Sequence, residues 1–460
     1  MSLYIKVNTR KRGLKRKRRR FVMKVLHHGG KNTVTGSCHE LVLQNGSVLI
    51  DCGLLQGQDN AQQQSLNIDF SISDLKAVVL THSHIDHVGR LPWLLAAGYK
   101  GPIYCTEATA ELVPLMLEDG LKLQLGMRRH QRENVLDFIR TLIRPCSYSQ
   151  WIEIEEHTSL RFQPAGHILG SAYVEFHLLN NEVVVFSGDL GPRNTPLLPD
   201  PVSPEKADYL FIESTYGNKV HEDVESRSRR LLSIIEHALQ DGGVIVIPAF
   251  SVGRTQELLF DIEQLIHEHA LQDSLPIILD SPLAKKVTTT YRQFKKLWGA
   301  EAKERLEHHR HPLAFDQCIT VESHTDHLKL VNRLASTTEA AIVVAASGMC
   351  EGGRVVNYLE ALLPDKRNDV LFAGYQAEGT LGRRIQDGEE NILIEGRRVR
   401  VEAQVHTMSG YSAHADRDDL IQFVSGIPTP PKEVHLIHGE QESKRSLYQQ
   451  LITLGYNCVI

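Results

Sequence analysis

Short apolar runs separated by turn residues fill the chain from Met23 to about Ile212, and their length is typical of β-strands. The run Ala77–Leu80 is wholly apolar and predicts a buried strand. A longer helical pattern covers about Thr109 to Arg144, and its Met, Leu and Ile residues are expected in the core. The other predicted strands of this region are Glu40–Leu43, Ser47–Ile50, Tyr173–His177 and Glu182–Phe186.

From about Glu213 the pattern changes to longer units, in which a buried strand and a turn precede a helix. The first unit joins the strand Gly243–Pro248 to the helix Thr255–His269. Such alternation predicts a mainly parallel sheet covered on both faces, with ligands bound beyond the carboxyl ends of its strands. The same rhythm gives the strands Pro276–Leu279, Ala340–Ala346 and Asp369–Ala373 and the helix Val355–Leu363.

Length and this change of pattern predict an α/β protein with more than one domain, because 460 residues exceed the roughly 250–300 that one core supports. Short strands return after about Asn391, so the region of strand–helix units is predicted to be inserted into the first domain. The expected segments are a first part at residues 23–212, an insertion at 213–394 and a closing part at 395–460.

Charge is concentrated at the start of the chain, where residues 1–22 carry ten Lys and Arg and no acidic residue, although the net charge is −5. This segment is expected to be a disordered basic arm that binds phosphate backbones. The alternative is an artefact of the chosen start, since Met23 directly precedes the first predicted strand. No apolar stretch approaches the roughly 20 residues of a membrane helix, so no membrane partner is expected. The scattered cysteines favour free thiols in the cytoplasm.

The densest chemical signal follows the buried strand at Ala77–Leu80, where three histidines and one aspartate fall within six positions. His82 and His84 are two residues apart, so in extended chain they point the same way. Asp86 and His87 follow where the chain turns. Imidazole nitrogen and carboxylate oxygen are ligands of zinc and related cations, and four of them in one short loop can hold two metals. The alternative is a polar loop with coincidental histidines.

Two more candidate ligands lie in glycine-flanked turns after predicted strands, His167 and Asp189. Each is a weak signal alone. With the histidine loop they complete a pattern that resembles the metallo-β-lactamase superfamily, which implies a four-layered αββα sandwich with a dinuclear zinc site. The resemblance places His82, His84 and His167 on one Zn²⁺, and Asp86 and His87 on the other, with Asp189 bridging. Asp51 matches the superfamily's first motif and is expected to orient ligand histidines.

Three later motifs resemble the β-CASP subgroup of nucleases, which includes the endonuclease subunit of the cleavage and polyadenylation machinery and related prokaryotic ribonucleases. They contain Glu213, His414 and His438. The resemblance implies that His438 is the last ligand of the second metal, that His414 faces the scissile phosphate, and that Glu213 hydrogen-bonds His414. It also implies that the insertion is the Rossmann-like β-CASP domain. Asp86 and Asp189 are counted among the catalytic residues with His414 and Glu213.

The inserted domain is expected to hold the substrate. Ser347, Gly348 and Arg354 lie where a strand passes into a helix, and free N–H groups at helix starts bind phosphate. Arg383 is a further candidate phosphate ligand and Arg254 a weaker one, while the alternative for each glycine turn is simple packing. The remaining histidine clusters match no family motif and are predicted to lie on the surface. They are His267 and His269, His308, His309 and His311, and His324 and His327.

Together these features predict a zinc-dependent ribonuclease, with Mn²⁺ as the alternative metal. A metal-bridging hydroxide would attack phosphodiesters of single-stranded RNA, and the resemblance implies 3′-hydroxyl and 5′-phosphate ends. The histidine at His438 favours RNA, because the DNA-repair branch typically has valine there. The alternatives are a DNA nuclease, a small-ester metallo-hydrolase and a catalytically inactive RNA-binding scaffold. Endonuclease or exonuclease mode and a homodimeric state are left open.

Overall fold

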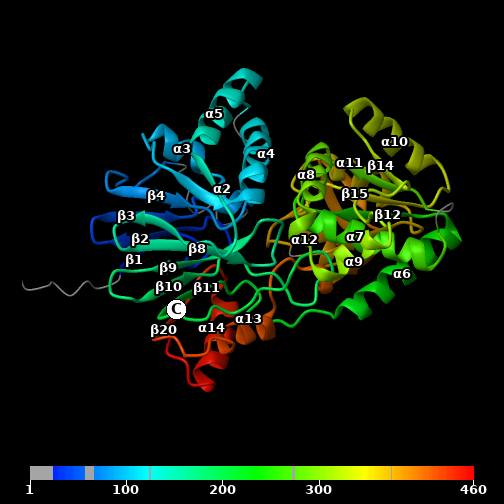
Figure 1. Ribbon diagram of the computed structural model, residues 1–460. Coiled ribbons are helices and arrows are strands. Elements are labelled where there is room, and N and C mark those ends of the chain that lie inside the picture. The colour runs from blue at the N-terminus through cyan, green and yellow to red at the C-terminus, as the bar shows by residue number, and fades with distance from the viewer. Residues whose placement is uncertain (1–23, 57–66, 124–125, 272–274, 375) are drawn as a thin grey trace, which may run out of the picture.

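The computed structural model describes residues 24–56, 67–123, 126–271, 275–374 and 376–460, and its ribbons form two lobes (Figure 1). The predicted basic arm at residues 1–22 lies outside the described residues. The first lobe contains the first part of the chain and its C-terminal part, and the second lobe contains the chain between them (Figure 1). This arrangement is an insertion of one lobe into the other.

The first lobe begins with a six-stranded sheet in the order β1-β2-β3-β4-β5-β6. Its first three strands are antiparallel, and β3 to β6 run parallel. The strands are β1 (Lys24–Gly29), β2 (Cys38–Leu43), β3 (Gly46–Ile50), β4 (Leu75–Val79), β5 (Ile103–Thr106) and β6 (Ile143–Cys146).

The second sheet of this lobe has seven strands in the order β21-β20-β11-β10-β9-β8-β7. Two of them come from the C-terminal end of the chain, and β20 pairs in parallel with β11, with Ile212 opposite Leu436. The strands are β7 (Ile152–Glu155), β8 (Thr158–Pro164), β9 (Ala172–His177), β10 (Val183–Phe186), β11 (Tyr209–Ile212), β20 (Glu433–Leu436) and β21 (Cys458–Val459). The C-terminal segment therefore completes the first lobe.

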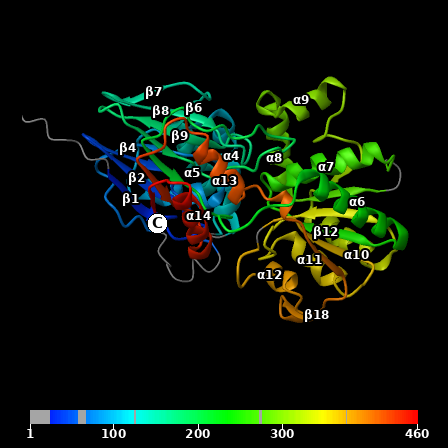
Figure 2. The same cartoon turned by 90° about the horizontal axis from the view of Figure 1, so that it is seen from below.

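Three apolar cores show that this lobe has four layers. The first sheet packs outward on helices α3 (Leu91–Ala96), α4 (Glu107–Leu123) and α5 (Arg129–Leu142). Its inner face meets the second sheet, as Val48 and Phe162 do. The second sheet packs outward on α13 (Arg417–Ser425) and α14 (Gln441–Thr453), which Figure 2 shows on that side. The predicted αββα sandwich is confirmed.

The second lobe is built on a parallel sheet in the order β14-β13-β15-β12-β16-β19. Alternate strand residues face opposite cores: Ile245 packs toward α6 (Val224–Asp241), and Val246 packs toward α11 (Arg354–Leu362). Helices cover both faces (Figure 2). The strands are β12 (Val244–Pro248), β13 (Ile277–Asp280), β14 (Cys318–Thr320), β15 (Ala341–Ala345), β16 (Asp369–Phe372) and β19 (Gln404–Thr407).

The remaining helices of this lobe are α7 (Arg254–Glu268), α8 (Pro282–Gln293), α9 (Ala300–Glu307), α10 (His324–Ser336) and α12 (Leu381–Gln386), and β17 (Asn391–Ile394) pairs with β18 (Arg397–Arg400) in a hairpin. The sequence pattern assigns β19 to the closing part of the first domain, yet it pairs with β16 in the inserted sheet. The helices α13 and α14 were not expected, because only short strands were predicted after Asn391.

The two lobes contact one another through polar bonds as well as apolar packing. Lys286 of α8 forms an ion pair with Glu118 of α4, at 3.0 Å. The hydroxyl of Tyr291 accepts a hydrogen bond from the backbone N–H of Leu169, at 3.0 Å. Within the described parts of the chain, no helix combines the length and the apolarity needed to cross a membrane.

Candidate metal centre between the lobes

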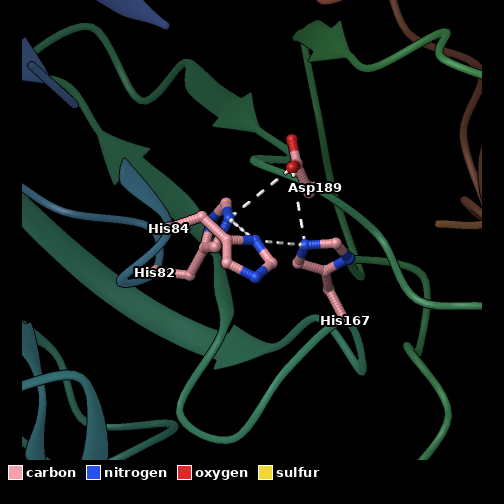
Figure 3. A group of neighbouring side chains, drawn as sticks. All are labelled: His82, His84, His167 and Asp189. Carbon is pink, nitrogen blue, oxygen red and sulfur yellow. Dashed lines mark hydrogen bonds and ion pairs between the residues drawn. The ribbon is translucent and has the colours of Figure 1, made fainter. Parts of the chain in front are cut away.

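Four predicted ligands meet at the ends of first-lobe strands, on loops that follow β4, β8 and β10. The imidazole Nε2 atoms of His82 and His167 lie 3.5 and 3.6 Å from Oδ2 of Asp189. Nδ1 of His84 lies 3.1 Å from Nε2 of His82 and 3.0 Å from Nε2 of His167. Figure 3 shows these side chains pointing at a common centre. Their potential ligand atoms lie within 4.8 Å of one another, a grouping that suits one cation.

A second group shares the same aspartate. Nε2 of His87 lies 3.3 Å from Oδ2 of Asp189 and 3.6 Å from Oδ2 of Asp86. Nε2 of His438, from the loop after β20, lies 3.3 Å from Oδ1 of Asp189. The helix α2 (Ile85–Val88) carries Asp86 and His87 on one turn. All seven predicted ligands therefore converge, and Asp189 belongs to both groups.

The donor atoms of this centre lack protein partners that would explain their burial. Within the described residues, Nε2 of His84, Nε2 of His87, Oδ1 of Asp189 and both ring nitrogens of His438 are buried without a hydrogen-bond partner. Orphaned buried polar atoms are costly, and cations would satisfy those that face the centre, which include Nε2 of His87, Nε2 of His438 and Oδ1 of Asp189. The residues present fit divalent metal ions.

Hydrogen bonds from outside the centre fix the orientation of two imidazoles. Nδ1 of His87 donates to Oδ2 of Asp51 at 2.7 Å, and that carboxylate also accepts from the backbone N–H of Thr81 at 2.8 Å. Nδ1 of His167 donates to the carbonyl of Ala413 at 2.7 Å. In both rings this leaves Nε2 facing the centre, which is how outer partners orient metal ligands. The sequence predicted the role of Asp51. It could not predict the bond to Ala413, because every residue has a backbone carbonyl and no residue type marks this one.

Close backbone packing brings the Asp86 turn against the Asp51 loop. The backbone N–H of Ser37 donates to the carbonyl of Asp86, at 2.9 Å. A Cβ atom at Gly53 would lie 1.5 Å from that same carbonyl oxygen, so no residue with a side chain fits there without moving the loop.

Burial and neighbouring charges set the protonation of these histidines in opposite directions. Burial lowers the pKa of His82 and His167 well below the usual value, and that of His438 to about 3. Neutral imidazoles of this kind have a free lone pair for a metal. Burial also opposes protonation of His87, but the carboxylates of Asp189 and Asp51 outweigh it and raise its pKa.

A third group joins His414 to the same aspartate. Nδ1 of His414 donates to the carboxylate of Glu213, with Oε2 at 3.2 Å, and lies 3.9 Å from Oδ2 of Asp189. Glu213 is fully buried and also accepts from the backbone N–H of Leu190 at 2.7 Å. Burial disfavours the imidazolium, yet the two carboxylates prevail and raise the pKa of His414. Because Nδ1 is held by Glu213, Nε2 is the ring atom left for a ligand.

A cavity of about 410 Å³ opens beside this centre and is lined by both lobes. His84, Asp86, His167, Asp189 and His414 line it from the first lobe. The second lobe contributes loops that follow strands β12 and β15, including Arg254, Ser347 and Gly348. Ligand sites of parallel sheets lie beyond the carboxyl ends of the strands, and this cavity does too.

Two predicted phosphate ligands are engaged elsewhere. The guanidinium of Arg354 donates to Asp280, at 2.5 Å, and to the backbone carbonyls of Val321 and Glu322, at 2.8 and 2.9 Å. Arg383 forms an ion pair with Asp387 at 2.9 Å. Neither arginine lines the cavity. The prediction failed because the sequence places each arginine near a helix start but does not show which carboxylate it contacts.

The ranking of the arginines is thus reversed, because Arg254, the weaker candidate, does line the cavity. The prediction that His327 lies on the surface is also wrong. Its ring is fully buried, donates from Nδ1 to Asp280 at 2.7 Å and lies 2.9 Å from Oδ1 of Asn357. His324 of the same helix is exposed as expected.

Three family descriptions match the chain in the order that the fold requires. The metallo-beta-lactamase superfamily matches residues 33–249, the Beta-Casp domain matches residues 255–385, and the Zn-dependent metallo-hydrolase RNA specificity domain matches residues 398–460.

Curated relatives match over nearly the whole chain. "Ribonuclease TTHA0252" of Thermus thermophilus is 37% identical over 94% of this chain and 97% of its own length. An "RNase J-like protein" of Methanocaldococcus jannaschii is 31% identical over 90% of this chain and 92% of its own. "Transcription termination factor FttA" of the same organism is 33% identical, but the match covers only 66% of its length.

A solved structure, a protein of unknown function from Enterococcus faecalis V583, has the same fold, with a TM-score of 0.52, 13% identity, and coverage of 92% of this chain and 95% of its own. The fold, the paired ligand groups and these matches lead to one assignment. The chain belongs to the metallo-beta-lactamase superfamily and, within it, to the proteins that carry a Beta-Casp domain.

Proposed function

We propose that this protein is a metal-dependent ribonuclease that hydrolyses phosphodiester bonds in single-stranded RNA. One observation carries the proposal: the Asp189 carboxylate is shared by two ligand groups and also faces His414, beside a cavity between two lobes. The names of the full-length relatives, a ribonuclease and an RNase J-like protein, support RNA as the substrate. The match to an RNA specificity domain supports it as well.

Two divalent cations, with Zn²⁺ as the expected ion, are the cofactors of this proposal. His82, His84 and His167 would hold one cation, and Asp86, His87 and His438 the other, with Asp189 between them. Bound cations of this kind lower the pKa of water and stabilise negative charge on phosphate oxygens. The imidazole-rich donor set suits zinc better than the oxygen-rich sites preferred by magnesium.

The chain's own acid in this scheme is His414. Its raised pKa favours the imidazolium near neutral pH, and its bond to Glu213 fixes the ring. An imidazolium at the cavity wall would donate a proton from Nε2 to the departing O3′ oxygen or stabilise charge on the phosphate. The products would then carry 3′-hydroxyl and 5′-phosphate ends. We place this activity in the cytoplasm.

Arg254 is the phosphate ligand that the geometry favours. Its side chain is only 7% exposed, and within the described residues its Nε and Nη1 atoms are buried without a hydrogen-bond partner. Burial lowers its pKa to about 10, so it still carries a charge at neutral pH. Charged N–H groups that are buried without an acceptor are costly, and a phosphate entering the cavity would supply acceptors for these two nitrogens.

The test of this proposal compares three substrates with the purified protein. We expect end-labelled single-stranded RNA to be cleaved, single-stranded DNA to be cleaved much more slowly, and both activities to disappear after treatment with a chelator. Re-addition of Zn²⁺ or Mn²⁺ should restore cleavage. Hydrolysis of a phosphodiester dye ester without cleavage of either nucleic acid would contradict the proposal and favour a small-ester hydrolase. Binding of RNA without any cleavage would favour a scaffold.

Replacing Arg254 by methionine should weaken RNA binding roughly 10- to 150-fold, because a hydrogen bond to a charged group contributes about 1.5–3 kcal/mol. The salt dependence of binding should also fall by about 0.7 in slope, the value for one single-strand phosphate contact. Binding is measured by RNA titration at several salt concentrations, in a His414→Ala background that limits cleavage. Arg383→Met, outside the cavity, is the matched control. An unchanged salt slope in Arg254→Met would remove its phosphate role.

A further inference from the structure

An aromatic side chain lies at the cavity wall without a role in the proposed chemistry. Phe250 follows strand β12, in the loop that leads into α7, and lines the cavity. Its side chain is 36% exposed, although most large apolar side chains of this lobe are buried. Exposed apolar surface inside a binding cavity usually marks a contact with a ligand.

The ring is held from one side by the second lobe's own backbone. A Cβ atom at Gly348 would lie 2.8 and 2.9 Å from Cδ2 and Cε2 of the Phe250 ring, so this backbone packs directly on it. The carbonyl of Gly348 is fixed by Nε2 of Gln376 at 2.8 Å. The carbonyl of Phe250 accepts from Oγ1 of Thr255, also at 2.8 Å. These bonds fix the backbone that carries the ring and the backbone that contacts it, which reduces the entropy cost of ligand contact.

The same loop touches the metal centre. Val252 lines the same cavity as the imidazole of His84. A Cβ atom at Gly253 would lie 2.6 Å from Cγ2 of Ile168, the residue after His167. Phe250 also lines the same cavity as His84 and Asp189, so a nucleotide that contacts its ring would share that cavity with the scissile phosphate.

We propose that Phe250 stacks on one nucleobase of the RNA next to the cleaved bond, an inference that rests on the proposed ribonuclease function. Proteins bind unpaired bases by stacking them on aromatic rings, and every base has a π-face, so this subsite would tolerate all four bases. An apolar protein segment is a less suitable occupant, because the cavity walls also carry the charged Arg254 and the Oγ of Ser347, which lacks a partner within the described residues.

The experiment scans an abasic nucleotide along a labelled RNA and measures kcat/KM for the wild type, Phe250→Leu and Phe250→Tyr. In the wild type we expect one abasic position beside the cleavage site to lower kcat/KM by about 5- to 150-fold, the effect of losing one stacked base. Phe250→Leu should show that loss on intact RNA and almost none further at that abasic position. Phe250→Tyr retains a ring and should restore most of the activity.

The matched control is Phe138→Leu, which changes an exposed phenylalanine of α5 that does not line the cavity. It should behave as the wild type on every substrate. Equal metal content and equal Tm in all variants exclude a folding defect. If Phe250→Leu lowers kcat/KM by the same factor on intact and on abasic RNA, relative to the wild type on each, the stacking role is overturned. If the wild type fails to cleave RNA at all, the proposed function fails instead, and this outcome is distinct.

Discussion

Replacing His414 by alanine is expected to lower kcat for RNA cleavage by roughly 10²- to 10⁴-fold while leaving the metal content unchanged. The size follows from the loss of a positioned proton donor. The metal content should persist because Nδ1 of His414 bonds Glu213, and its distance to the shared carboxylate of Asp189, 3.9 Å, is longer than those of the ligand histidines. Rates come from single-turnover cleavage and metal content from elemental analysis.

A modified substrate can distinguish two roles of His414, that of proton donor and that of charge stabiliser. In RNA with sulfur replacing O3′ at the cleaved bond, the leaving thiolate needs no proton. If His414 is the acid, His414→Ala should cleave this substrate nearly as fast as the wild type does. A defect of equal size on both substrates would assign charge stabilisation instead. His324→Ala, an exposed histidine of α10, is the control, and loss of metal from His414→Ala would show that His414 is a ligand.

Replacing Asp189 by asparagine should remove both cations and lower RNA cleavage by more than about 10³-fold, beyond the 10- to 100-fold cost of losing an outer partner of a metal site. Its Oδ2 atom faces both groups, through His167 and His87, and its Oδ1 atom faces His438 of the second group. The amide keeps the shape but removes the negative charge that both groups share. His438→Ala is the matched contrast and should deplete one cation while the other stays.

Thermal unfolding gives a second measurement that does not depend on activity. Free metal at about 100 times its Kd should stabilise the wild type by about 2.7 kcal/mol, because only the folded state assembles the ligands. The Tm of Asp189→Asn should respond little to added metal. A full metal complement in Asp189→Asn, or a Tm that rises with metal as in the wild type, would contradict a shared ligand.

Much of the fold could be predicted from the sequence because short apolar runs mark the strands and longer amphipathic segments mark the helices. The predicted strands at Gly243–Pro248 and Asp369–Ala373 differ by one residue from β12 and β16. Alternate faces of these strands meet different helices, so nearly all of their residues are apolar, with Asp369 at the start of β16 as an exception. The helices α13 and α14 were missed since only strands were predicted after Asn391.

The convergence of the candidate metal ligands was predictable for a different reason, since they are rare residue types at characteristic spacings. In the second lobe, the prediction reached the cavity residues Ser347 and Gly348 but misplaced the arginines. Arg254 and Arg354 each begin a helix, and only tertiary packing decides that Arg354 meets Asp280 whereas Arg254 reaches the cavity. The burial of His327 could not be predicted because its partner, Asp280, is distant in sequence.

The pairing of β11 with β20 has a consequence for synthesis of the chain. These neighbouring strands are separated by the whole second lobe, so the sandwich closes only after more than 200 intervening residues have been made. A ribosome-bound chain that ends at β16 has neither His414 nor His438. Contacts so distant in sequence form late. The candidate metal centre would therefore stay incomplete until the chain has been made as far as β20 and the loop after it.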